Sequence, residues 1–252
     1  MPKTAKTKRM ILPATDKGGV GKSFFCVQLV DWLKRRHPDR SWVAFDPDAS
    51  NQTLKRFHPE TQFLDVGKHS GLDPVFLALG EAEIAICDGV GAQQKSLFQK
   101  WVEEVSLVDL AEEAGIGITY YLSIEDSTDV IHSVRSIMEE VGDRVDWLLV
   151  RNLKQAREFT LWDRSTAYEL FRKLQGREIV FEAVQPSLVT FYDHKNLPFS
   201  ECDSQPEVNV LDMQRFRNLT DRIDEQFASV ASILVPKGTG GRQAKKTAKT
   251  GG

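Results

Sequence analysis

The sequence has few cysteines, no long apolar run and almost no net charge. Its 252 residues include three cysteines, Cys26, Cys87 and Cys202, which are far apart and form no C-x-x-C pair. Neither a disulfide framework nor a metal or iron–sulfur motif is therefore indicated. No apolar stretch approaches the roughly 18 residues of a membrane span, and the N-terminus lacks a signal-peptide pattern. We expect a cytoplasmic protein with reduced, inert thiols.

The basic residues gather at the two ends of the chain, although the formal net charge of -3 gives no overall nucleic-acid signature. We predict flexible basic tails at 1–8 and 235–252 around a domain at 9–234. The basic residues in and next to these tails are Lys3, Lys6, Lys8, Arg9, Lys237, Arg242, Lys245, Lys246 and Lys249. Such tails either contact DNA phosphates or an acidic membrane surface non-specifically, or stay solvated without a partner.

Strand and helix patterns alternate along the domain. Apolar runs predict strands near 10–13, 41–45, 84–87, 116–123, 146–151 and 178–181. Helical periodicity predicts helices near 24–36, 73–79, 93–114, 127–141, 161–175 and 210–234. This order is typical of a single-domain α/β protein, with a mostly parallel twisted sheet, helices on both faces and ligands at the carboxyl ends of the strands.

The segment 16–23, with the sequence Asp-Lys-Gly-Gly-Val-Gly-Lys-Ser, joins the first strand to the first helix, which is the context of a P-loop. Its glycines allow backbone N–H groups to approach a polyphosphate at the positive end of the helix. Lys22 would neutralise β- and γ-phosphate charge, and the Ser23 hydroxyl would hold Mg²⁺. The alternative is a glycine turn with a solvated lysine. The candidate nucleotide-binding residues here are Gly18, Gly19, Val20, Gly21, Lys22, Ser23 and Phe24.

A second lysine, Lys17, precedes the first glycine, and a plain P-loop does not require it. The pattern Lys-Gly-Gly-Val-Gly-Lys-Ser resembles the deviant Walker A signature of the ParA/MinD family of P-loop ATPases, and the resemblance extends over about residues 9–234. It implies that Lys17 reaches the nucleotide of the partner subunit in an ATP-bound homodimer and takes part in catalysis with Lys22. A local phosphate contact is the alternative for Lys17.

Two carboxylates follow the second predicted strand, at Asp46 and Asp48. Alone, this spacing also fits a turn or a helix N-cap. The segment resembles switch I of the ParA/MinD family, which implies that Asp46 supports the Mg²⁺ shell through water. It also implies that Asp48 either orients the attacking water or reports on the γ-phosphate. The usual Asp-Pro-Gln continuation is absent, because Ala49 and Ser50 stand in those places.

Asp88 ends the third predicted strand, as a Walker B carboxylate does, and Gly89 follows it. The segment resembles switch II without its usual proline, and a simple Asp-Gly turn is the alternative. The resemblance thus implies metal ligation by Ser23, Asp46 and Asp88, with ATP and Mg²⁺ as cofactors.

Two residues farther along are candidates for nucleobase contact. Asn152 ends the strand at 146–151 and resembles the family's base-contacting asparagine, although a capping or turn role also fits. Pro186 lies in a segment that resembles the loop over the base. We expect the helix at 210–234 to pack on the core; its mixed-charge polar face argues against membrane binding.

The resemblance implies an ATPase that hydrolyses slowly, dimerises with ATP and recruits a protein partner. The stretch from Asp46 to Leu54, the helix around Trp101 and the strand end at Asn152 look like the TraL-type ATPases encoded with plasmid conjugation genes. Partition or positioning of DNA or a protein complex is the alternative role. A nucleotide-binding adaptor without turnover and a phosphotransferase or synthetase on the same fold also stay open.

Overall fold

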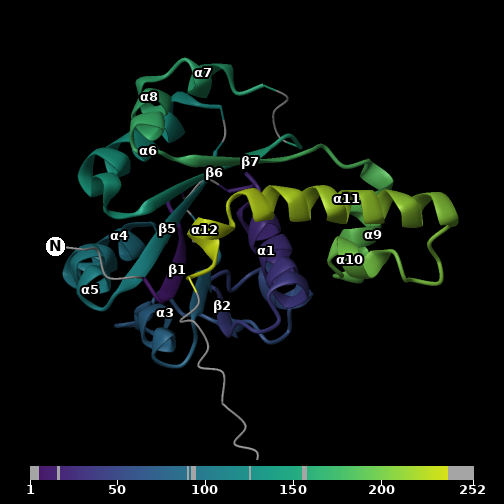
Figure 1. Ribbon diagram of the computed structural model, residues 1–252, viewed down its shortest axis with the longest axis horizontal. Coiled ribbons are helices and arrows are strands. Elements are labelled where there is room, and N and C mark those ends of the chain that lie inside the picture. The colour runs from purple at the N-terminus through teal and green to yellow at the C-terminus, as the bar shows by residue number, and fades with distance from the viewer. Residues whose placement is uncertain are drawn as a thin grey trace, which may run out of the picture.

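Seven parallel strands form one sheet in the part of the chain that the structure describes (Figure 1). The computed structural model describes residues 6–15, 18–89, 91, 95–124, 126–154 and 158–237. The strands are β1 (Lys8–Pro13), β2 (Trp42–Asp46), β3 (Gln62–Phe63), β4 (Ile84–Cys87), β5 (Ile116–Ser123), β6 (Asp146–Asn152) and β7 (Arg177–Phe181). Their order is β3-β2-β4-β1-β5-β6-β7 and every pairing is parallel, so the predicted fold class is confirmed.

Helices cover both faces of the sheet. One face carries α3 (Asp73–Leu77), α4 (Lys95–Glu104), α5 (Leu107–Glu113), α6 (Thr128–Val141), α7 (Thr160–Asp163) and α8 (Thr166–Lys173). The other carries α1 (Lys22–Arg36), α2 (Thr53–Phe57), α9 (Pro186–Lys195), α10 (Phe199–Cys202), α11 (Val210–Ser229) and α12 (Ala231–Leu234). Two short 3₁₀ helices, η1 (Ala78–Gly80) and η3 (Gly142–Arg144), precede β4 and β6.

The central strands are mostly apolar because both of their faces are covered. Successive side chains of a strand point to opposite faces, so Tyr120 joins the core under α4 and α6 while Tyr121 joins the core under α1. All three cysteines are buried free thiols, as we expected. These two cores fix β1 at the centre of the sheet, where its carboxyl end leads into the glycine-rich segment.

In the structure, each of three predicted helices is divided into two shorter helices. The helix predicted at 93–114 breaks into α4 and α5 because Ser106 takes a left-handed conformation with φ 47°. The one predicted at 161–175 divides at Ser165, whose hydroxyl caps α8 by accepting from the Tyr168 amide. The one predicted at 210–234 divides at Val230. The short elements β3 and α2 were not predicted.

The domain boundary at the N-terminus differs from the predicted one. β1 begins at Lys8, whose ammonium group donates to the carbonyl oxygens of Leu79 and Gly80. Arg9, the first residue of the predicted domain, is 5% exposed and forms an ion pair with Asp146, so Lys8 belongs to the fold together with Arg9. Residues 1–5 and 238–252, which make up most of both predicted tails, lie outside the described residues.

The prediction that the C-terminal helical segment packs on the core is confirmed. Phe216 and Phe227 of α11 are fully buried, and Figure 1 shows α11 beside α1, which it contacts. Within the described residues, no helix is both long enough and apolar enough to span a membrane.

Candidate functional site

The glycine-rich segment turns sharply into α1. Gly19 and Gly21 have φ values of 77° and 98°, in the left-handed region that favours glycine. Gly21 is the N-cap of α1, and no side chain caps this helix end or places an acid in its first turn. The first amides of a helix lack intrahelical partners, so this end of α1 attracts an anion.

Lys22 lies across Gly89, the residue after Asp88. Its side chain is 8% exposed, and a Cβ atom at Gly89 would approach its Cε atom to 2.0 Å. Any larger residue at 89 would therefore displace the lysine. The contact brings together the phosphate loop and the end of β4, as the sequence predicted.

Asp46 and Asp88 bring two buried carboxylates to the ends of β2 and β4. Asp88 is 2% exposed; its burial and the neighbouring Asp46 raise its pKa to about 7, although the Gly89 amide, the Ser23 hydroxyl and Lys22 favour the ionised form. Burial also raises the pKa of Asp46. A cation bound between these two carboxyl groups would favour their ionised forms, so the pair is a candidate cation site.

The two carboxylates of the segment after β2 have different partners. Asp46 accepts from the amide of Asp48 at 3.0 Å and from the amide of Lys55 at 3.2 Å, so it fixes the start of α2. Asp48 accepts from the amides of Ser50 at 2.8 Å and Asn51 at 3.1 Å, and from the Asn51 side chain at 3.3 Å. Asp48 thus fills the turn-capping role that the sequence left open.

The oxygen donors here suit Mg²⁺. Ser23 is hydrogen-bonded to Asp88, and Asp46 lies close enough to raise the pKa of that carboxyl. Within the described residues no group of three His, Cys, Asp or Glu side chains forms a complete metal cage. Magnesium is normally held by one or two carboxylates together with substrate phosphates and water, which matches this donor set.

Asn152 lies directly beside the phosphate loop. A Cβ atom at Gly21 would approach its Nδ2 atom to 2.2 Å, and its Oδ1 atom accepts from the Lys154 amide at 3.0 Å. The side chain therefore both caps its own turn and faces the loop. The sequence had left these roles as alternatives.

An aromatic hollow opens next to Asn152. It is lined by Gly19, Gly21, Phe24, Thr53, Asn152, Lys154, Glu182, Val184, Val189, Tyr192, Asp193 and Phe199. The Phe24 ring meets the rings of Tyr192 and Phe199 edge-on, with centroids 5.9 Å and 5.8 Å apart. The resemblance had placed the segment around Pro186 over the base, but the contribution of Tyr192 was not predicted.

Some predicted site residues are not among these walls. Pro186 is exposed in the first turn of α9, and Val184 and Val189 line the hollow in its place. Val20 is buried at 3% exposure. Asp16 and Lys17 lie outside the described residues, so the role of Lys17 stays a prediction.

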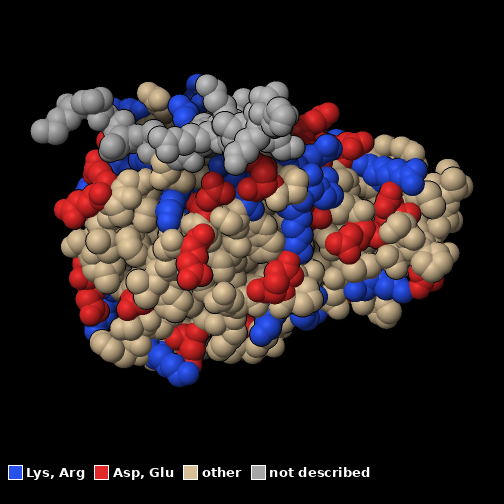
Figure 2. All heavy atoms as spheres, turned by 60° about the horizontal axis from the view of Figure 1, so that its bottom comes forward, with Lys and Arg blue, Asp and Glu red and all other residues tan. Residues whose placement is uncertain are grey.

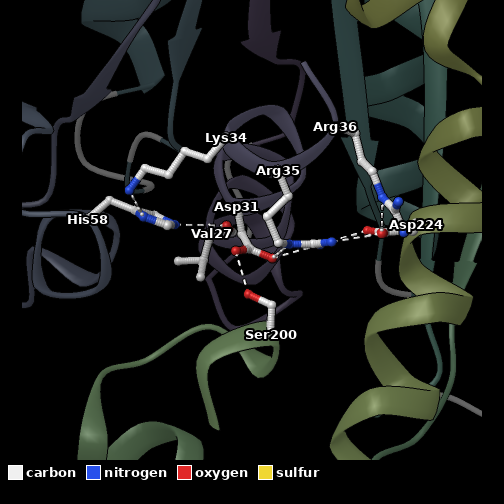
Figure 3. Close-up of polar contacts among 8 residues, drawn as sticks. All are labelled: Val27, Asp31, Lys34, Arg35, Arg36, His58, Ser200 and Asp224. Atoms are coloured by element: carbon white, nitrogen blue, oxygen red, sulfur yellow. Dashed lines mark hydrogen bonds and ion pairs between the residues drawn. The ribbon is translucent and has the colours of Figure 1, made fainter. Parts of the chain in front are cut away.

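The far end of α1 carries a network of charges (Figure 3). Arg35 makes a two-pronged ion pair with Asp224 of α11, at 2.8 and 2.7 Å, and its Nε atom donates to Asp31 at 3.0 Å. Arg36 also donates to Asp224, and the Ser200 hydroxyl of α10 donates to Asp31 at 2.6 Å. This network joins α1 to the C-terminal helices.

A phosphate-loop turn after the central strand, with Lys22, Ser23 and two strand-end carboxylates around it, defines a P-loop type of α/β fold. No protein-family model matches the chain, and no curated protein matches its sequence.

Among solved structures, the chain is similar to the MinD cell division protein of Aquifex aeolicus, with 12% identity, a TM-score of 0.48 and coverage of 92% of this chain and 100% of that one. It is also similar to MinD in the MinC:MinD complex of the same organism, with 13% identity, a TM-score of 0.43 and coverage of 92% and 99%. A nucleotide-binding protein from Archaeoglobus fulgidus in complex with ADP shows 13% identity, a TM-score of 0.42 and coverage of 75% and 87%. Similarity at this level assigns no function.

Proposed function

We propose that this chain is a Mg-ATP-binding, slowly hydrolysing switch of the ParA/MinD type that dimerises with ATP. The observation that carries the proposal is the meeting of Lys22, Ser23 and the carboxyl groups of Asp46 and Asp88 at the start of α1. An anion-attracting helix end beside a cation-attracting pair of acids suits a metal-bound polyphosphate.

The chain's own residues would divide the work. Lys22 and the α1 amides bind the phosphates, while Ser23 and Asp88 hold the cation, with Asp46 behind them. When bound, Mg²⁺ neutralises charge on the transferred phosphoryl group. Phe24 and Asn152 face the hollow where the base of the nucleotide would lie. Asp48 would have to leave its contacts with Ser50 and Asn51 to orient a water.

Those contacts of Asp48 favour a second candidate function, a nucleotide-binding adaptor without turnover. Measuring ATP hydrolysis together with molecular mass in Mg-ATP separates the two. The switch predicts slow turnover and a nucleotide-dependent dimer, whereas the adaptor predicts binding without turnover. Turnover that rises with a small acceptor, without dimerisation, would instead indicate a phosphotransferase or synthetase.

Two lysine variants test the dimer. We expect Lys22→Ala to lose ATP binding and Lys17→Ala to keep binding but stay monomeric in Mg-ATP, because the resemblance assigns Lys17 to the partner's nucleotide. Sedimentation with and without nucleotide measures both. A Lys17→Ala chain that dimerises as the wild type does would overturn the trans role of Lys17.

For the biological setting we propose plasmid conjugation or DNA transfer, with partition or positioning as the alternative. Figure 2 shows one face of the molecule, on which acidic and basic side chains are interspersed. Contact with DNA through the predicted basic tails, most of which lie outside the described residues, is proposed from the sequence alone. The Asp48→Ala chain, arrested with ATP, would recover a partner: a conjugation protein supports the proposal, and a segregation protein supports the alternative.

A further inference from the structure

A second hollow lies on the opposite face of the sheet from α1. It has a volume of about 70 Å³ and is lined by residues of α4, α6, β5 and the end of β1. Most of its lining is apolar, including Phe98 and Val102 of α4 and Ile137 of α6. No basic residue lines it, but Glu103 of α4 and Glu140 of α6 do, one from each wall.

Of the polar side chains of this hollow, Thr15 is paired, because its hydroxyl donates to the Ser123 carbonyl oxygen at 2.9 Å. The side chains of Glu103 and Glu140 are exposed and form no ion pair within the described residues. Tyr120 of β5 is 3% exposed and lines the hollow, yet its hydroxyl has no hydrogen-bond partner among the described residues. This hydroxyl is open to the hollow, so a polar group bound there would replace water as its hydrogen-bond partner.

We propose that this hollow receives a lysine or arginine side chain that a partner protein carries next to an apolar residue. The long stem of such a side chain packs on apolar walls while its cationic head reaches polar groups at the rim. Glu103 and Glu140 supply the complementary charge, and Tyr120 accepts a hydrogen bond. A neutral or acidic segment would leave both carboxylates unpaired.

The position of the hollow gives its occupant a route to the glycine-rich segment. Pro13 and Thr15, which lead from β1 toward that segment, line one side, and α4, which lies beyond Asp88 in the chain, forms another. A partner seated here contacts the elements on both sides of the candidate nucleotide site. The binding itself does not depend on nucleotide, so it is testable separately.

The test uses the full chain and the labelled peptide acetyl-Leu-Arg-Leu-Arg-Leu-amide, with fluorescence anisotropy as readout. We expect the Glu103→Gln, Glu140→Gln double variant to bind this peptide about tenfold more weakly at low salt, as expected for two exposed charge pairs. Tyr120→Phe weakens binding about threefold, which is the order of one net hydrogen bond. Glu113→Gln, an exposed acid of α5, is the matched control and leaves binding unchanged.

Three results would overturn the proposal. The first is equal binding of the arginine peptide by the wild type and the double variant. The second is equal binding of a peptide with glutamate in place of arginine. The third is tighter peptide binding by a full-length chain with Arg242, Lys245, Lys246 and Lys249 changed to alanine, because the chain's own tail would then occupy the hollow.

Discussion

The two ends of α1 are built on opposite principles. At the N-terminal end, Gly21 caps the helix without a side-chain hydrogen bond, and the first turn has no acidic residue. At the C-terminal end, Arg35 and Arg36 place positive charge where the helix dipole favours it, and Asp224 of α11 pairs with both. One end has no side-chain cap, and the charges of the other are paired within the protein.

The difference shows where stability and function separate. Although burial alone would raise the pKa of Asp224, its bonds to Arg35 and Arg36 hold that pKa below its usual range, so this pair stabilises the fold. At the other end, burial and Asp46 raise the pKa of Asp88 instead, so those acids are poorly stabilised without a cation. The ion pairs of Asp224 favour the folded state, whereas the raised pKa of Asp88 is what a bound cation would lower.

The largest expected effect comes from breaking the N-terminal end with Gly21→Val. A β-branched residue is strained at a φ of 98°, and its Cβ atom would collide with Asn152. We expect ATP affinity, measured by calorimetry, to fall about a hundredfold, or about 2.7 kcal/mol. Gly80→Ala is the control, because a Cβ atom there meets nothing. Unchanged affinity in Gly21→Val would mean that this helix end is not the anion site.

We expect the next largest effect from Asp224→Ala, which breaks the ion pairs at the C-terminal end of α1. This change affects the stability of the fold rather than ATP affinity. It removes the ion pair of Arg36 and leaves Arg35 with Asp31 alone; since both arginines are partly exposed, we expect the free energy of unfolding to fall by about 1–2 kcal/mol. Urea denaturation measures this, with Asp221→Ala on the exposed side of α11 as control. A larger loss of ATP affinity than of stability would show that the two ends are coupled.

The same contrast explains what the sequence could predict. The phosphate loop could be predicted from the sequence because its glycines, Lys22 and Ser23 lie within one short segment that follows an apolar strand. The end of β4 at Asp88 could be predicted for the same reason. Local chemistry after a buried strand is a strong signal.

The missing parts depend on distant contacts or on unusual backbone. Tyr192 and Phe199 contact Phe24 from helices more than a hundred residues away in sequence, and no local sequence pattern predicts these ring contacts. Ser106 breaks a helix by adopting a left-handed conformation that serine rarely takes. β3 has only two residues, both exposed, so it shows no alternation.

A smaller effect sharpens the comparison at the first turn of α1. Phe24→Leu keeps an apolar side chain but removes the ring that lines the hollow beside Asn152. If this ring contacts the base, we expect ATP affinity to fall about tenfold while affinity for inorganic tripolyphosphate, which has no base, is unchanged. Calorimetry with both ligands measures the ratio, and equal losses would place Phe24 in the phosphate-binding part of the site.

The smallest effect concerns the middle of α1, where His58 follows α2. Its Nε2 atom lies 2.9 Å from the Val27 carbonyl oxygen and its Nδ1 atom 3.0 Å from the Lys34 ammonium group, so the ring donates to one and accepts from the other only when neutral (Figure 3). Burial, and then the charge of Lys34, lower the pKa of His58, although the bond to Val27 opposes this.

The native state therefore binds a proton at His58 less readily than the unfolded chain does, whose histidine has a pKa of about 6.5. The stability contributed by neutral His58 is fully present above that pH and is lost as the pH falls toward the folded-state pKa. We expect the free energy of unfolding to fall between pH 7.5 and 5.5 by more in the wild type than in His58→Gln, with exposed His132→Gln behaving as the wild type does. If wild type and His58→Gln lose stability in parallel, the ring is not held neutral in the folded protein, and its contacts with Val27 and Lys34 do not stabilise α1.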